Sequence, residues 1–158
     1  TAAYANLYNA QGDAQKGKLT NPTGGTIRSD SEGDGKFGSP RGNRKHLGID
    51  LSTKVGQDVV SPVAGKAVNY TGATTKYPMV DITPADQTLG IDKVRILYTN
   101  APSGTRAWSS YPVSAGGVIG SAANLQGLGY SSGVSPHIHL QIMSGGQWVD
   151  PTPYFFSP

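Results

Sequence analysis

Short apolar runs alternate with glycine, proline and serine along the chain from Asn21 onward. Brief apolar runs bounded by such turn-forming residues are typical of β-strands rather than of helices. We therefore predict strands at six segments: 59–60, 66–70, 79–82, 93–98, 117–120 and 138–143.

The segment 93–98 has the clearest two-residue period. One set of alternate positions holds Val94, Ile96 and Tyr98, and the other holds Arg95, Leu97 and Thr99. Successive strand residues point to opposite faces, so one face of this strand is expected to be more buried than the other. The chain is predicted to be all-β, mainly antiparallel sheet, with long loops at 29–43, 101–111 and 124–136 around one end.

The first twenty residues have a different character. They are polar and rich in alanine, and Leu7 and Tyr8 are nearly their only large apolar residues. We interpret residues 1–20 as a linker or the end of an upstream segment, and residues 21–158 as one domain. A chain of 158 residues with 22 glycines and 11 prolines is consistent with a single core connected by many turns.

Composition narrows the possible functions. With 36% hydrophobic and 15% charged residues the chain is too apolar for a disordered protein, and no apolar run is long enough to span a bilayer. The net charge of +3 is small and scattered, so nucleic-acid binding is the least favoured class. The one basic cluster, Arg41, Arg44 and Lys45, adjoins the first histidine, and we interpret it as the rim of a site.

The histidines indicate where chemistry occurs. Of three in the chain, His137 and His139 are two residues apart in a strand-like run, which puts both side chains on one face. Since each imidazole has ring nitrogens to satisfy, such a pair fits a metal or a reaction centre better than a core. Because the chain has no cysteine, a metal would be held by histidine and carboxylate groups.

The third histidine begins a second motif. His46 and Asp50 are four residues apart with Gly48 between them, and glycine permits the bend that would bring two ligands together. One histidine of the later pair would complete three protein ligands and leave a fourth position open, as in catalytic zinc sites. Taken separately, His46 could be a surface residue beside the basic cluster and Asp50 a turn cap. Their occurrence together favours a metal site.

Both motifs resemble those of a known family. His46 to Asp50 (HLGID) and Pro136 to His139 (PHIH) are similar to the paired motifs of lysostaphin/LytM-type zinc endopeptidases, which cut peptide cross-links of bacterial peptidoglycan. Segments 54–68, 79–82, 117–120 and 148–154 resemble later landmarks of the family, so the resemblance covers about residues 24–154.

The resemblance implies a role for each motif residue. His46, Asp50 and His139 would bind Zn²⁺, and His137 would stand beside the metal as the catalytic proton acceptor. The implied substrates are peptidoglycan stem peptides or cross-bridges, and the implied location is extracellular, periplasmic or on a virion. The segment 70–77 and loops around the site would wall a substrate groove.

One position departs from the family pattern. Active members usually carry another histidine in a Tyr-x-His-Leu segment, where this chain has Tyr98, Thr99 and Asn100. Asn100 can donate a hydrogen bond to an oxyanion but cannot shuttle a proton, and Tyr98 is a further candidate for an oxyanion or substrate contact. Tyr111, Tyr130 and Arg106 are other possible donors. The alternative function is a zinc-retaining, inactive module that binds cell-wall peptide or a protein partner.

Overall fold

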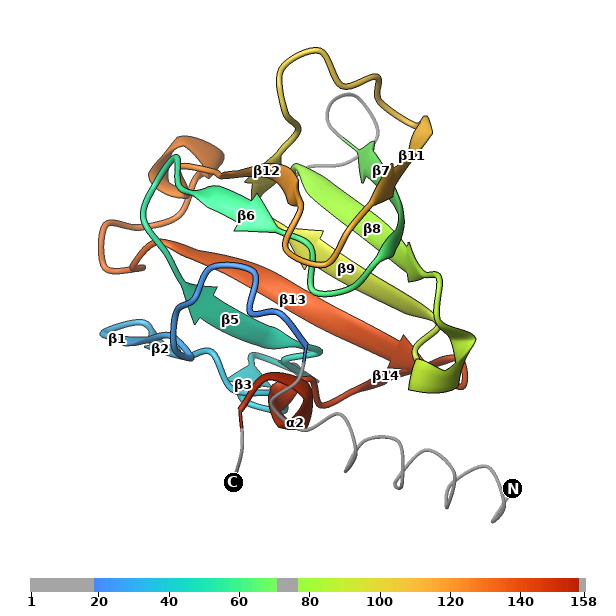
Figure 1. The fold of residues 1–158 in the computed structure, drawn as a ribbon. Helices are drawn as coiled ribbons and strands as arrows, with labels where there is room; N and C mark the ends of the chain where they lie inside the picture. Colours follow the sequence, from blue (N-terminus) through green and yellow to red (C-terminus); the bar gives the residue numbers. More distant parts are fainter. Residues whose placement is uncertain (1–18, 71–76, 157–158) are drawn as a thin grey trace.

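The computed structural model describes residues 19–70 and 77–156 of the chain (Figure 1). Most of the predicted linker, residues 1–18, lies outside the described residues, as does the 71–76 part of the predicted groove wall. Leu19 is buried in the core, and its backbone nitrogen donates to the oxygen of Tyr154 at 3.2 Å.

A seven-stranded antiparallel sheet forms the main body. Its strands run in the order β11-β7-β8-β9-β13-β14, and β5 also pairs with β13. The bounds are β5 (Ile49–Ser52), β7 (Gly65–Tyr70), β8 (Met79–Pro84), β9 (Lys93–Leu97), β11 (Ser110–Val113), β13 (His137–Ser144) and β14 (Gln147–Val149). The central strand β13 pairs with β9 along one edge and with β5 and then β14 along the other.

Smaller elements surround this sheet. A three-stranded sheet has the order β10-β12-β6, and two hairpins, β1-β2 and β3-β4, precede β5. Their bounds are β1 (Ser29–Asp30), β2 (Gly33–Asp34), β3 (Pro40–Arg41), β4 (Arg44–Lys45), β6 (Asp58–Val60), β10 (Thr99–Asn100) and β12 (Val118–Ala122). The helical elements are short: η1 (Gln87–Leu89), η2 (Gln126–Leu128) and α2 (Thr152–Phe155). Among the described residues, no helix has the length and apolar character of a membrane span.

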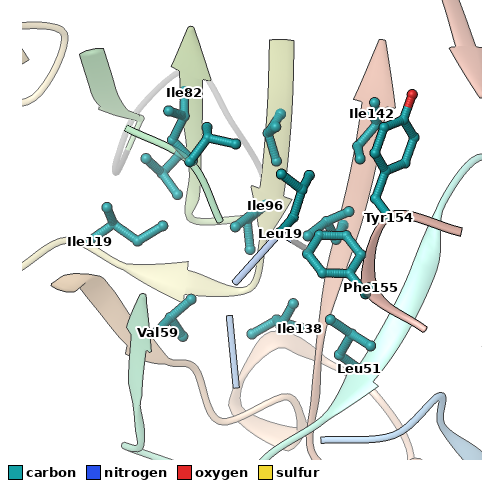
Figure 2. Close-up of a cluster of buried hydrophobic side chains, with 14 of the residues drawn as sticks. Leu19, Leu51, Val59, Ile82, Ile96, Ile119, Ile138, Ile142, Tyr154 and Phe155 are labelled. Carbon is teal, nitrogen blue, oxygen red and sulfur yellow. The ribbon is translucent and has the colours of Figure 1, made fainter. Parts of the chain in front are cut away.

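One face of the main sheet is covered by the core. Ile138, Leu140 and Ile142 of β13 are fully buried on that face and belong to a cluster with residues of β5, β6, β12 and α2 (Figure 2). Since strand residues alternate, His137, His139 and Gln141 project from the other face of β13. The core thus anchors the strand that presents both histidines away from it.

The predicted all-β, mainly antiparallel architecture is confirmed, and the six predicted segments all contain strands. Strand β9 is one residue shorter than predicted, because Tyr98 has a left-handed backbone (φ 62°) and ends it at Leu97. The predicted loop at 29–43 contains β1, β2 and β3, which are too short for a hydrophobic period to reveal.

Candidate functional site

Strand pairing brings the two histidine motifs together. In the register of β5 and β13, Asp50 is the direct partner of His139 and Ser52 that of His137. The backbone that joins His46 to β5 passes close to β13 at Gly48, where a Cβ atom would lie 2.1 Å from the backbone oxygen of Leu140. Only glycine permits this close approach, so Gly48 is the residue that lets His46 reach the Asp50–His139 pair.

Three side-chain atoms converge at one point. Nε2 of His46 lies 2.9 Å from Nδ1 of His139, which lies 3.0 Å from Oδ1 of Asp50. The His46 nitrogen and the Asp50 oxygen are 3.2 Å apart, and all three residues are buried. In a tetrahedral zinc site with bonds of about 2.0–2.1 Å, neighbouring ligand atoms lie roughly 3.3 Å apart. The triangle therefore has nearly the dimensions of a zinc-ligand set.

The outer ring nitrogens determine which atoms face the centre. Nδ1 of His46 lies 2.9 Å from the carbonyl oxygen of Lys36, and Nε2 of His139 lies 2.8 Å from Oε1 of Gln141. Because both partners are hydrogen-bond acceptors, the outer nitrogens carry the protons and the inner ones present lone pairs. Two lone pairs and a carboxylate at these distances repel one another unless a cation or a shared proton lies between them. The donor set fits zinc.

The Asp50 carboxyl group remains ionised in this buried position. Burial alone raises its pKa, but when His139 and His46 share a proton with the carboxylate, their hydrogen bonds and the positive charge of the histidines outweigh that effect and hold the pKa well below its ordinary value.

His137 lies beside the triangle. Its Nδ1 lies 2.8 Å from the carbonyl oxygen of Ser135, so Nδ1 carries the proton and Nε2, 3.7 Å from Oδ2 of Asp50, presents a lone pair. Burial lowers the pKa of His137, although the negative charge of Asp50 acts against this shift. A neutral imidazole with a free Nε2 can accept a proton.

A buried ion-pair chain, which the sequence analysis did not identify, supports Asp50. Nε of Arg28 lies 3.2 Å from Oδ2 of Asp50, and its Nη1 donates to Oδ1 of Asp30 at 2.8 Å. The other carboxylate oxygen of Asp30 accepts hydrogen bonds from the backbone nitrogen and Oγ of Ser135, both at 2.8 Å. The segment Thr26 to Asp30 has no motif or period that marks Arg28 or Asp30, so the sequence carried no signal for them.

The triangle and His137 line a cavity of about 530 Å³. Six of the lining residues come from the region of the β1-β2 and β3-β4 hairpins: Arg28, Glu32, Arg41, Arg44, Lys45 and Leu47. The other lining residues are mainly apolar or aromatic: Tyr77, Leu97, Tyr98, Tyr130 and Val134.

Tyr98 lines the cavity, whereas Asn100 lies outside it. The Tyr98 ring lies edge-on to His137 at a centroid distance of 5.5 Å, and its hydroxyl is 2.5 Å from that of Tyr130. Burial raises the pKa of Tyr98, which keeps its hydroxyl protonated and able to donate. Asn100 is exposed on β10 and does not line the cavity, and neither do Tyr111 and Arg106. Of the possible donors that the sequence suggested, Tyr98 and Tyr130 face the site.

Comparison with known proteins gives matches in structure only. No family model and no curated protein matches the sequence. Csd3 from Helicobacter pylori matches with a TM-score of 0.60 at 20% identity, over 89% of this chain and 33% of that chain. The antimicrobial peptidase lysostaphin from Staphylococcus simulans matches with a TM-score of 0.57 at 18% identity, over 87% and 55%. A chain of the SpoIIQ-SpoIIIAH pore-forming complex matches with a TM-score of 0.58 at 16% identity, over 91% and 94%.

These matches identify the architecture. The chain has the fold of lysostaphin-type peptidases, as the motifs predicted. It spans about a third of Csd3 and about half of the lysostaphin chain. Identities of this size show a shared fold, and a shared fold does not by itself assign an activity.

Proposed function

We propose that this chain is a zinc-dependent endopeptidase that cleaves the peptide cross-links of bacterial peptidoglycan. The observation that carries the proposal is the buried triangle of two imidazole lone pairs and a carboxylate beside a neutral imidazole, His137. A purely structural zinc site has no need of the fourth group, whereas peptide hydrolysis needs a proton acceptor.

The position of each site residue gives it a separate role in hydrolysis. His46, Asp50 and His139 would hold the zinc ion, which when bound supplies Lewis-acid polarisation of the peptide carbonyl and acidifies water. His137 accepts a proton at Nε2, because its Nδ1 is occupied by the Ser135 carbonyl oxygen, and returns it to the leaving amine. Tyr98, whose ring lies edge-on to His137, would offer its hydroxyl as a hydrogen-bond donor to a developing oxyanion.

The remaining parts of the proposal follow from the resemblance. Residues 21–158 would form the peptidase domain, and residues 1–20, of which Leu19 packs into the core of that domain, a linker or the end of an upstream segment. Since the substrate is a wall polymer, the protein would act outside the cell, in the periplasm or on a virion.

A second candidate function is a zinc-retaining module that binds wall peptide or a protein partner without cutting it. Asn100 favours it, because the resemblance places a catalytic histidine there. The match to a chain of a pore-forming complex supports it as well, since that fold occurs in a protein assembly.

Hydrolysis of purified peptidoglycan by zinc-loaded protein, with fragments identified by mass, tests both candidates. If the chain is a peptidase, the natural protein should release fragments. His137→Ala, which keeps the three metal-binding side chains, should release none. Zinc content measured on the same samples is the control for loss of metal.

Binding of wall peptide separates the second candidate from the first, because Asn100 lies outside the cavity lining and Asn100→His is not expected to restore activity. If the zinc-loaded natural protein binds peptidoglycan peptides but releases no fragments, the chain is a binding module on a disarmed peptidase fold and the peptidase proposal is wrong.

A further inference from the structure

The two sides of the cavity differ in charge. His139 lies between Asp50 of β5 on one side and Leu97 of β9 on the other. The hairpin β3-β4 leads into β5, while Tyr98 follows β9. A ligand that crosses the triangle therefore has cations along one side and aromatic rings along the other.

The charges on the cationic side are not balanced within the site. Four cationic side chains line the cavity, Arg28, Arg41, Arg44 and Lys45, against the carboxylates of Glu32 and Asp50. Arg28 and Asp50 pair with each other, and Asp50 belongs to the metal triangle. In the part of the chain that the structure describes, Arg44 and Lys45 form no ion pair.

Arg41 has no carboxylate at direct hydrogen-bonding distance, although the charges of Asp34 and Asp50 both act on it. Its nearest carboxylate atom is Oδ2 of Asp50, at 3.7 Å, and its Nη2 instead donates to the backbone oxygen of Asp34 at 2.8 Å. Its side chain is 29% exposed, so it remains within reach of a ligand in the groove.

The hairpin also concentrates like charges. Arg41 and Arg44 are direct register partners across β3 and β4, so their side chains share one face of the ribbon. Like charges directly opposite each other destabilise a strand pair. Gly42, with φ 62°, makes the tight turn that holds them in this arrangement. An anion between the two strands' side chains would remove the repulsion.

We infer that Arg41 and Arg44, which share one face of the β3-β4 ribbon, form together with the neighbouring cavity-lining Lys45 a subsite that binds a carboxylate group of the peptide in the groove. The inference rests on the proposed function and specifies its substrate: a peptide that carries a free carboxylate close to the bond held at the triangle, rather than a bridge of glycines alone. Arginine and lysine bind carboxylates through charge-assisted hydrogen bonds, and arginine can do so with two at once.

Binding of four labelled hexapeptides to the zinc-loaded protein tests the subsite. One is capped at both ends and contains a glutamate, and the second has glutamine in its place. The third is the glutamine peptide with a free C-terminal carboxylate, and the fourth is capped hexaglycine. Fluorescence anisotropy at low and high salt measures affinity. If the subsite binds a carboxylate, the glutamate peptide or the free-C-terminus peptide should bind about fivefold more tightly than the capped glutamine peptide at low salt.

Matched variants locate the effect. Arg44→Gln/Lys45→Gln should abolish the preference for a carboxylate. Lys54→Gln/Lys66→Gln removes the same charge from exposed positions outside the cavity lining and should keep it. Which of the two carboxylate peptides binds more tightly distinguishes a side-chain carboxylate from a terminal one.

The outcomes separate this inference from the peptidase proposal. Carboxylate-dependent binding that needs Arg44 and Lys45, without hydrolysis of peptidoglycan, would support the subsite and contradict the peptidase. Equal binding of all four peptides, binding of none, or a preference that survives Arg44→Gln/Lys45→Gln would overturn the subsite, whatever the peptidoglycan assay gives.

Discussion

Asp30 and Ser135 are separated by 105 positions in the chain, yet Oδ2 of Asp30 accepts two hydrogen bonds from Ser135, from its backbone nitrogen and from its hydroxyl. The other Asp30 oxygen accepts from Arg28, which contacts Asp50. The carbonyl oxygen of Ser135 in turn accepts from Nδ1 of His137. One carboxylate thus connects the support of a metal ligand with the support of the proton acceptor.

Replacing that carboxylate should destabilise the protein in a pH-dependent way. Asp30→Asn leaves the buried Arg28 with a weaker partner, and we expect the free energy of unfolding at neutral pH to fall by about 2–3 kcal/mol. Burial by itself raises the pKa of Asp30, but hydrogen bonds from Arg28 and Ser135 more than offset this and hold its pKa well below the ordinary value.

The sign of the pH effect follows from that lowered pKa. A group whose pKa is lower in the folded state stabilises the fold above its unfolded pKa of about 4, and the stabilisation is lost as the pH falls further. Denaturant melts at neutral pH and at about pH 3 should therefore show the gap between natural protein and Asp30→Asn narrowing in acid. Asp58→Asn, at an exposed strand position, is the control. A gap independent of pH would contradict the ionised role of Asp30.

Zinc should stabilise the natural protein strongly. A ligand bound only by the folded state at about a thousand times its Kd adds about 4 kcal/mol, which raises the Tm of a domain of this size by on the order of 10 °C. Thermal melts of chelator-treated and zinc-loaded protein measure the shift. His139→Ala should lose most of it, whereas His137→Ala should keep it. Equal loss in both variants would mean that His137 is itself a ligand.

Gly48 should tolerate no side chain. A Cβ atom there would lie 2.1 Å from the backbone oxygen of Leu140, so Gly48→Ala must separate β5 from β13 or displace His46. We expect a loss of about 3 kcal/mol or more in unfolding free energy together with weaker zinc binding. Gly127→Ala, whose Cβ would meet nothing nearer than 3.9 Å, should behave like the natural protein.

The Tyr98 hydroxyl should contribute to turnover more than to binding. Tyr98→Phe keeps the ring against His137 and removes only the group paired with Tyr130. If that hydroxyl stabilises the oxyanion, kcat on a peptide substrate falls by about a hundredfold with little change in KM. Tyr111→Phe, outside the cavity lining, is the matched control. Unchanged kcat in Tyr98→Phe would exclude this role.

The strands and the two histidine motifs could be read from the chain because their signals are local. The alternation in 93–97 and 138–143 expresses the two-residue period of a strand, and this period puts His137 and His139 on one face. Neither inference needs to know what the strand pairs with.

The roles of Tyr98, Asn100 and Arg28 depended on the tertiary structure. Asn100 occupies the position at which the motif led us to expect a donor, but the left-handed backbone at Tyr98 breaks the alternation, and the tyrosine lines the cavity while Asn100 lies on the surface. Arg28 and Asp30 became part of the site through hydrogen bonds to residues 22 and 105 positions away.

The sequence by itself determined the all-β class, the main strands and the residues able to bind a metal, since strand periodicity and ligand chemistry are properties of short segments. The tertiary structure decided the register that sets Asp50 opposite His139, the tautomers of His46 and His139 that turn ring lone pairs inward, and the opposed cationic and aromatic sides of the groove. These depend on contacts between distant parts of the chain, whose free energy is gained only when the sheet is assembled.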